Sequence, residues 1–326
     1  MQMPNSPLRF QPLFQYRIWG GDKLNHLLNK DTDGSSVGES WEVSGIPEAE
    51  TVVCEGPLRG KKLSELIDTY QAEFLGDKVW EQFGRNFPLL IKFIDAKQPL
   101  SVQVHPDDQW ARIHHNSLGK NEMWYILDAA PNAELILGFK HHLSPQEYEN
   151  HVTQATLKEV LHSEHVQRGD VFYIPTGLVH AIGAGVVLAE IQQTSDITYR
   201  IYDYDRVDPK TGEKRFLHTE KAKAVADLGP AKEYAVSYKS NLNSSNTLIK
   251  TPYFHTNYLP LAGLMERDYG SLDSFVILIG VAGITQLLHE TKTYTITTGQ
   301  VLLLPAHIGE LTLESQQSEL IEVYIP

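Results

Sequence analysis

The chain has 326 residues and a formal net charge of −13, with 41% hydrophobic and 21% charged residues. These proportions are ordinary for a globular protein of one or two domains, and the acidic balance argues against a surface for nucleic acid or anionic membranes. Cys54 is the only cysteine, and neither a membrane-spanning stretch nor a signal segment is recognisable, so we expect a cytoplasmic protein without internal disulfides.

The first part of the chain predicts strands separated by one helix. Alternating or continuous apolar runs predict strands over residues 7–21, 38–44 and 87–96. The composition of residues 31–36 (DTDGSS) predicts a polar loop, and apolar residues at helical spacing predict a helix over residues 63–75. Lys92 interrupts the last of these strands, so its ammonium must reach a polar cavity or extend to solvent.

Helices with recognisable caps are predicted in the middle of the chain. One begins at Asp107, and Ser/Thr-x-x-Glu signatures at 144–147 and 156–159 predict two more. Another covers residues 218–226, with Thr219 as its cap. Strands are predicted over residues 123–127, 171–174, 186–193 and 198–204. The pattern indicates a mainly β protein with helical insertions at about 61–85 and 107–165.

Residues 241–246 (NLNSSN) are the best linker, and the chain beyond them is rich in strand signals. These strands are predicted over residues 274–280, 293–297, 301–304 and 320–325. Gly299-x5-Pro305 repeats the opening of the segment 169–175, and Glu310 stands where that first copy has His180. The repeat indicates a second barrel that has lost its metal site. The alternative is coincidence, because glycine and proline are common at strand ends.

The segment 169–180 (GDVFYIPTGLVH) is the centre of the functional prediction. Its short apolar strand ends at Pro175, which has no N–H for ladder pairing, and Gly177 permits a tight turn. This geometry presents the imidazole of His180 at the mouth of a β-barrel. Taken alone, the pattern also fits a turn with a half-buried histidine bonded to backbone.

A second segment, residues 98–122, supplies complementary donors. Gln103 and His105 share one face of a strand, and Glu122 stands where the next strand begins. Together with His180 they offer an amide oxygen, two imidazoles and a carboxylate, which suits a divalent metal. The QVHP sequence alone can simply end a strand, but jointly the two segments predict one site.

These motifs resemble the type I mannose-6-phosphate isomerases (phosphomannose isomerases) of the cupin superfamily, in their short bacterial form. The resemblance implies a mainly β fold of two tandem cupin barrels, jelly-roll-like, with a small helical insertion. A catalytic domain would cover residues 1–240, and a degenerate cupin-like domain residues 246–326. The implied cofactor is one Zn²⁺ per chain, with another divalent metal possible. Its implied ligands are Gln103, His105, Glu122 and His180.

The resemblance also implies roles for residues outside the metal site. Those implied in catalysis are Arg200, Lys120 and Glu39. Those implied in substrate binding are Ser101, Lys92, Trp19 and Asp196. We expect the phosphate end of the pocket to be formed by Ser101, Lys92, Lys120 and Arg200. Arg206 stands where the family places a lysine, so no role of that lysine is carried over.

The implied reaction is the interconversion of mannose 6-phosphate and fructose 6-phosphate through an enediol-type intermediate, with the metal as Lewis acid. The base is open between Glu39, a hydroxide on the metal and a pocket lysine. Two rival functions are an Fe(II) cupin dioxygenase and a non-catalytic regulatory cupin that binds sugar phosphate. The glutamine ligand and the basic residues argue against the dioxygenase. We expect a small-molecule sugar phosphate as partner, no nucleic acid or membrane, and a monomer or homodimer.

Overall fold

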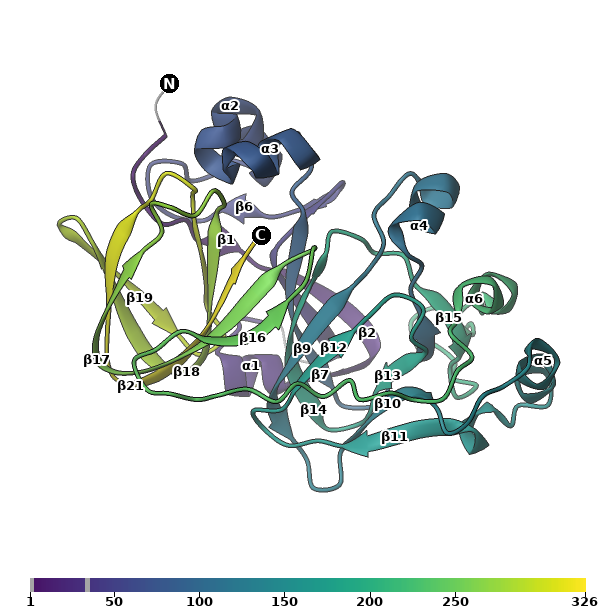
Figure 1. The fold of residues 1–326 in the computed structure, drawn as a ribbon. Coiled ribbons are helices and arrows are strands. Elements are labelled where there is room, and N and C mark those ends of the chain that lie inside the picture. The colour runs from purple at the N-terminus through teal and green to yellow at the C-terminus, as the bar shows by residue number, and fades with distance from the viewer. Residues whose placement is uncertain (1–2, 33–35) are drawn as a thin grey trace.

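The structure, a computed structural model, describes residues 3–32 and 36–326 as two β bodies packed side by side (Figure 1). The N-terminal body contains two antiparallel sheets. The larger one has six strands, in the order β12 (Val171–Ile174), β9 (Glu122–Ala129), β14 (Val186–Gln193), β7 (Leu89–Ala96), β2 (Leu13–Gly21) and β3 (Val37–Val43). The smaller one has five, in the order β11 (Leu161–His165), β10 (Glu134–Phe139), β13 (His180–Ile182), β8 (Val102–Val104) and β15 (Tyr199–Tyr202).

The two sheets of the N-terminal body face each other across a shared apolar core. Ile94, Trp124 and Leu188 enter this core from the larger sheet. Leu135 and Ile182 enter it from the smaller sheet. Because side chains alternate between the faces of a strand, each sheet contributes every second residue to the layer between them, as in a β-sandwich.

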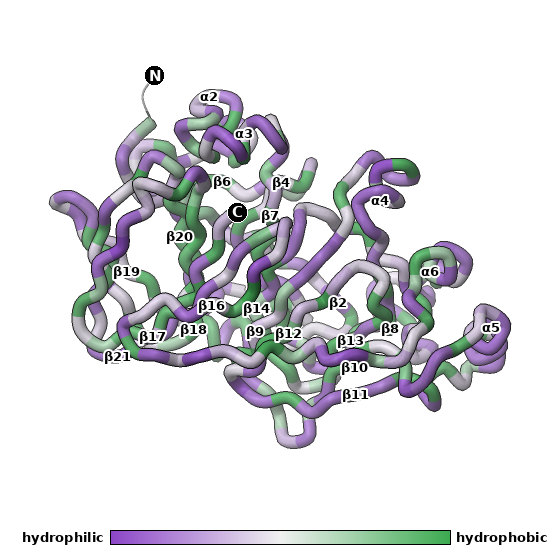
Figure 2. Tube along the Cα trace, viewed as in Figure 1, coloured by the Kyte–Doolittle hydropathy of each residue, from purple (hydrophilic) through white to green (hydrophobic). Residues whose placement is uncertain are grey.

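The larger sheet is covered on its second face as well, by the C-terminal body. Every residue of β7 and β14 is buried. Ile91 and Ile191 belong to the outer face and pack in one cluster with Ile277, Ile279 and Ile321 of the C-terminal body. A strand buried on both faces needs a continuous apolar run, which explains the unbroken hydrophobic pattern of these two segments. Figure 2 shows hydrophobic chain where the bodies meet and mainly hydrophilic chain along β11 at the far edge.

The C-terminal body is one curled antiparallel sheet. Its strands run in the order β16 (Asn246–Lys250), β17 (His255–Asp268), β21 (Glu310–Tyr324), β18 (Val276–His289) and β19 (Lys292–Thr297), and β20 (Val301–Leu304) pairs with β18. Leu259, Leu278, Leu302 and Leu313 of four different strands pack in one cluster on the inner face. A single sheet can enclose its own core only by curling, and bulges such as the one at Gly263 permit the bend.

Two short strand pairs and the helices complete the structure. The pairs are β1 (Phe10–Gln11) with β6 (Val52–Val53), and β4 (Gly45–Ile46) with β5 (Ala49–Glu50). The helices are α1 (Lys23–Leu28), α2 (Leu63–Leu75), α3 (Asp77–Phe83), α4 (Asp108–His115), α5 (Pro145–Thr153), the 3₁₀ turn η1 (Leu157–Glu159) and α6 (Thr219–Val225). Among the residues described, none of these helices has the length and apolarity needed to span a membrane.

Several predicted elements are confirmed with their bounds. β12, β14 and α2 begin and end at the predicted residues. Asp107 caps α4 by accepting the N–H of Trp110. Ser144 and Glu147 form the reciprocal capping box of α5. The mainly β fold with small helical insertions is therefore confirmed. Residues 61–85 contain α2 and α3, whereas residues 107–165 contain three strands as well as α4 and α5.

Three predictions need correction or fall outside the structure. The signature at 156–159 yields only the 3₁₀ turn η1, because the Thr156 hydroxyl lies 2.8 Å from His151 Nδ1 instead of capping a helix. Thr219 is the first residue of α6 rather than its cap, and the flanking residue His218 makes no side-chain cap bond. Half of the polar loop predicted at 31–36, residues 33–35, lies outside the described residues.

Candidate active site

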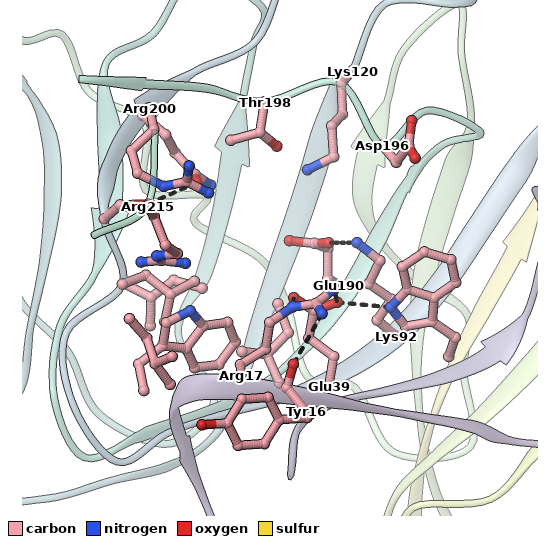
Figure 3. A pocket seen from close by; sticks show the side chains of 18 of the residues that line it. Tyr16, Arg17, Glu39, Lys92, Lys120, Glu190, Asp196, Thr198, Arg200 and Arg215 are labelled. Atoms are coloured by element: carbon pink, nitrogen blue, oxygen red, sulfur yellow. Dashed lines mark hydrogen bonds and ion pairs between the residues drawn. The ribbon is translucent and has the colours of Figure 1, made fainter. Parts of the chain in front are cut away.

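A cavity of about 440 Å³ lies between the two sheets of the N-terminal body (Figure 3). One wall is the inner face of the larger sheet, and the opposite wall is the smaller sheet. Its polar and charged lining residues are Tyr16, Arg17, Glu39, Lys92, Ser101, Gln103, Lys120, Glu190, Asp196, Thr198, Arg200, Asp208 and Arg215. Charged groups are rare inside an apolar sandwich, so their concentration here marks a candidate site of chemistry.

Three predicted site residues form a row across the smaller sheet. His180 of β13 is the register partner of Gln103 in β8, and Gln103 is also the partner of Arg200 in β15. Residues directly opposite one another in a sheet share a face. The sheet therefore presents an imidazole, an amide and a guanidinium side by side, although they come from segments far apart in the chain.

Two buried imidazoles expose one nitrogen each to a common point. His105 Nδ1 lies 2.8 Å from the carbonyl oxygen of Ile197, and His180 Nδ1 lies 2.8 Å from that of Leu178. A carbonyl oxygen only accepts, so each Nδ1 carries the hydrogen and each Nε2 keeps a lone pair. Burial lowers the pKa of His180 to about 4, and burial and the charge of Lys120 lower that of His105. Both rings are thus neutral at physiological pH and ready to act as ligands.

Glu122 completes this group, and its carboxylate is fully buried. Its Oε1 lies 3.5 Å from His105 Nε2, and its Oε2 lies 3.9 Å from His180 Nε2. Oε2 has no hydrogen-bond partner within the described part of the chain, while Oε1 accepts from Lys120. Burial and the nearby charge of Glu190 raise the pKa of Glu122. A buried carboxylate oxygen without a donor, facing two imidazole lone pairs, fits a divalent cation.

Gln103 lies beside this group rather than apart from it. Its Nε2 is 3.5 Å from His180 Nε2, and its Oε1 is 3.5 Å from the hydroxyl of Ser101. The amide oxygen is therefore within reach of the same point if the side chain turns about its last bond. His105, Glu122 and His180 place their ligand atoms within 4.8 Å of one another, so they could hold a metal ion, and the Gln103 amide lies next to them.

The turn motif explains how the two histidines come together. Gly177, three residues beyond the end of β12, adopts a φ of +83°, in the left-handed region that favours glycine. Its N–H donates to the carbonyl oxygen of His105 at 2.9 Å. The turn that carries His180 is thus bonded directly to the end of the strand that carries the other imidazole.

The cavity also holds a buried ion pair. Lys92 and Glu190 are cross-strand partners in β7 and β14, and Lys92 Nζ lies 3.2 Å from Glu190 Oε1. Trp124 Nε1 donates to Glu190 Oε2 at 3.0 Å, and the Lys92 ammonium lies 5.1 Å from the ring centre of Trp41. Lys92 is the one charged residue in an apolar run, and Glu190 neutralises its ammonium inside the cavity.

Glu39 is held as an ionised carboxylate. Arg17 donates to both of its oxygens, at 2.8 and 3.0 Å, and Trp41 Nε1 donates to Oε2 at 2.7 Å. Burial alone raises the pKa of Glu39, but the charges of Arg17 and Lys92 outweigh burial and bring it to about 2.

The opposite end of the cavity is rich in arginine. Figure 3 shows Arg200 and Arg215 together there, away from Lys120 and Asp196. Arg200 donates to the carbonyl oxygen of Phe216 at 2.8 Å, and its buried Nε has no partner in the described residues. Burial and the neighbouring charge of Arg215 lower the pKa of Arg200 to about 10. Crowded guanidinium groups with an unused donor are typical of an anion site.

The predicted site residues all line the cavity or belong to the group of His105, Glu122 and His180. Of the four expected around the phosphate, Ser101 and Lys120 lie next to that group, Lys92 pairs with Glu190, and Arg200 lies beside Arg215. Trp19 is buried in the wall, where its ring fills the space above Gly38.

Four charged lining residues were missed: Arg17, Glu190, Asp208 and Arg215. Glu190 had a usable signal, since it is the one charged residue in the apolar run VVLAEIQQ, as Lys92 is in its own run. Arg17 and Arg215 lie among other polar residues, and their positions depend on the fold.

Comparison with known proteins agrees with this geometry. Residues 8–129 match the family model for the catalytic domain of phosphomannose isomerase type I, and residues 244–325 match the cupin domain of mannose-6-phosphate isomerase. Mannose-6-phosphate isomerase ManA of Bacillus subtilis is 36% identical, with 96% of this chain and 97% of that protein covered. The probable mannose-6-phosphate isomerase GmuF of the same organism is 35% identical, over 94% of this chain and 96% of that protein.

A solved structure shows the same fold. The crystal structure of the mannose 6-phosphate isomerase from Bacillus subtilis superposes with a TM-score of 0.89 at 33% identity, covering 98% of this chain and 99% of that one. The predicted cupin fold is confirmed by these matches. The chain belongs to the type I mannose-6-phosphate isomerase family.

Proposed function

We propose that mannose 6-phosphate and fructose 6-phosphate are interconverted in this cavity, with a zinc ion at one end and the phosphate group at the other. One observation carries the proposal. Two neutral imidazoles and an unpartnered carboxylate oxygen converge at one end, and Arg200 and Arg215 crowd the opposite end. An aldose or ketose phosphate has the matching polarity, with its C1–C2 oxygens at one end and its phosphate at the other.

The residues that would hold zinc are Gln103, His105, Glu122 and His180. Imidazole nitrogen and carboxylate oxygen are typical zinc donors, and neutral Gln and His ligands leave the ion net positive. When bound, such an ion supplies Lewis-acid polarisation of the substrate carbonyl. The backbone carbonyls that accept from the two imidazoles fix the ring orientations and make them better donors.

Proton transfer between C1 and C2 needs a titratable group near the metal end. Lys120 is the closest candidate, because its Nζ lies 3.2 Å from His105 Nε2 and bonds Glu122. Glu39 accepts three hydrogen bonds and stays ionised, which suits it to fix Arg17 and Trp41 in the cavity wall. We therefore assign proton transfer to Lys120 and an orienting role to Glu39.

Arg200 is proposed to bind the phosphate, with Trp19, Ser101, Lys92 and Asp196 shaping the cavity around the sugar. A phosphate monoester carries about −1.5 to −2 charge near neutrality. Arg200 has an unused buried donor and no carboxylate partner among the described residues, whereas Lys92 is neutralised by Glu190.

A coupled assay tests the activity and the metal together. Purified protein should convert mannose 6-phosphate, lose activity after dialysis against a chelator, and recover it with stoichiometric Zn²⁺. Full activity after complete metal removal would exclude a metal-dependent isomerase. Recovery with another divalent ion but not with Zn²⁺ would exclude zinc while leaving the site in place. Family membership already disfavours a dioxygenase and a purely regulatory cupin.

The Arg200→Met variant tests the position of the phosphate. A hydrogen bond to a charged group is worth roughly 1.5–3 kcal/mol, so kcat/KM for mannose 6-phosphate should fall about 10- to 150-fold while metal content is unchanged. Activity on free mannose should change little. An equal loss on both sugars would place Arg200 at the C1–C2 chemistry instead.

Cellular location, domain division and assembly also belong to this proposal. The single cysteine and a metabolic sugar phosphate favour the cytoplasm. We divide the chain into a catalytic domain over residues 1–240 and a cupin-like domain over 246–326 that binds no metal. Whether the protein is a monomer or a homodimer stays a prediction, which light scattering of the purified protein decides.

A further inference from the structure

Residues 203–218, here named the strap, connect β15 to α6 and border the cavity. Val207 and Lys214 pair in an antiparallel bridge, and the N–H of Asp208 donates to the carbonyl oxygen of Glu213 at 2.8 Å, so the strap folds into a hairpin. Two cavity-lining residues, Asp208 and Arg215, belong to it. The strap thus contributes directly to the site, although it is neither strand nor helix.

The tip of the strap reaches the opposite wall of the cavity. The Tyr16 hydroxyl of β2 donates to Asp208 Oδ1 at 3.4 Å, and Lys210 Nζ lies 3.3 Å from the centre of the Tyr16 ring. These contacts connect the larger sheet with the segment that follows the smaller one. The strap is therefore held at both sides of the arginine end.

Arg215 is placed by a carboxylate within the strap. Its Nε donates to Asp203 Oδ2 at 2.8 Å, and its Nη2 donates to Asp203 Oδ1 at 2.5 Å. A guanidinium that uses its Nε side for one carboxylate keeps its other edge for a second acceptor. Arg215 also lines the cavity beside Arg200, so this second edge is available to a bound ligand.

Arg206 binds the same carboxylate but is directed elsewhere. Its Nη2 donates to Asp203 Oδ1 at 2.5 Å, and its Nη1 donates to the carbonyl oxygen of Pro99 at 2.6 Å. Asp203 therefore balances only one of two arginines, and Arg200 is not paired with a carboxylate in the described chain. Arg200, which has no carboxylate partner in the described chain, and Arg215, which keeps one free edge, are therefore the two guanidinium groups at this end that can meet a phosphate dianion.

We propose that Arg215 is the residue that makes the enzyme specific for phosphorylated sugars, with Asp203 as its positioning residue. This inference rests on the proposed phosphate position and extends it from Arg200 to the strap. The phosphate accepts from the free edge of Arg215 and from Arg200 at once. A free sugar has no dianion to satisfy these donors, so it gains nothing from Arg215.

The test compares Arg215→Met with Arg206→Met. Both residues bind Asp203 and have similar side-chain exposure, 19% and 14%, but only Arg215 lines the cavity. Arg215→Met should lower kcat/KM for mannose 6-phosphate about 10- to 150-fold, mainly through KM, and should leave activity on mannose nearly unchanged. The inhibition constant of inorganic phosphate should rise by a similar factor. Arg206→Met should change sugar selectivity and phosphate inhibition much less than Arg215→Met, because Arg206 does not line the cavity.

Asp203→Asn tests the positioning role separately. It should raise KM for mannose 6-phosphate with kcat retained, and Asp203→Glu should restore part of the loss. If Arg215→Met does not fold, Arg215→Lys is measured instead. Lysine keeps the positive charge but cannot bond Asp203 and the phosphate with two edges of one planar group, so the selectivity for the phosphorylated sugar should be intermediate.

The outcomes separate this inference from the proposed function. If Arg200→Met loses selectivity and Arg215→Met does not, the phosphate position stands and the role of Arg215 is refuted. If neither variant changes selectivity or phosphate inhibition, the phosphate is bound elsewhere and both proposals fail. Equal losses on both sugars in Arg215→Met would likewise overturn its assignment as a specificity residue.

Discussion

Replacing Glu39 by glutamine tests how much the buried charge network of the cavity contributes to stability. Glutamine keeps the size of the side chain and one oxygen, but it cannot carry the charge that Arg17 and Lys92 surround. The Arg17 side chain is 31% exposed and can be hydrated when its partner is neutral, whereas Glu39 itself is only 11% exposed. The main loss is therefore the stabilisation of the ionised carboxylate.

The magnitude follows from the pKa of Glu39, which is lowered from 4.5 to about 2 in the folded protein. Each pKa unit corresponds to about 1.4 kcal/mol, so the ionised carboxylate contributes about 3 kcal/mol to the free energy of unfolding at neutral pH. Because the folded-state pKa is the lower one, this contribution is fully present above about pH 5 and is lost as the pH falls toward 2. Near pH 3 less than half of it is left.

Urea unfolding of Glu39→Gln and the parent protein at neutral pH and near pH 3 measures this contribution. The variant should be less stable by about 3 kcal/mol at neutral pH, and the difference should shrink to about half or less near pH 3. Glu81→Gln, at an exposed position of α3, is the matched control and should change stability by less than about 0.5 kcal/mol. A difference that is the same at both pH values would show that packing, rather than charge, accounts for the loss.

Three further predictions concern the metal and the contact between the bodies. His180→Ala should lose metal and activity together, measured by elemental analysis, whereas His162→Ala, whose side chain is 36% exposed, should keep both. Glu310→Gln should leave metal content unchanged, and loss of a second stoichiometric metal in that variant would contradict a metal-free C-terminal body. Phe275→Ala should lower the free energy of unfolding by about 3–5 kcal/mol, since the ring is fully buried and lies 4.7 Å from that of Phe87. Unfolding within about 1 kcal/mol of the parent would contradict that packing.

Local sequence patterns were enough to predict the elements that are buried along their whole length. β14 is buried on both faces, so its apolar run marks it without knowledge of its neighbours. The strands β16 and β17 were missed, and β18 and β21 were predicted only in part. β17 contains Pro260 and a bulge at Gly263, which interrupt the alternation that identifies a strand. Their pairing depends on partners distant in the sequence.

The grouping of His105, Glu122 and His180 was predictable because each half forms a short motif of its own. Its geometry, however, depends on sheet order, which places His180 of β13 directly opposite Gln103 of the neighbouring strand β8. The arginine end had no such motif. Arg215 lies in a polar segment, and its role is visible only once Asp203 and the cavity wall are in place.

The larger sheet is buried on both faces, and this determines how the protein can unfold or be divided. The face of β7 that lies opposite Lys92 packs on Ile277 and Ile279, so a chain cut at residues 241–246 would expose a broad apolar surface to water. The isolated N-terminal half should therefore aggregate rather than work as a minimal enzyme. Heating the intact chain should unfold both halves in one cooperative transition, because each half exposes a large apolar surface when the other is removed.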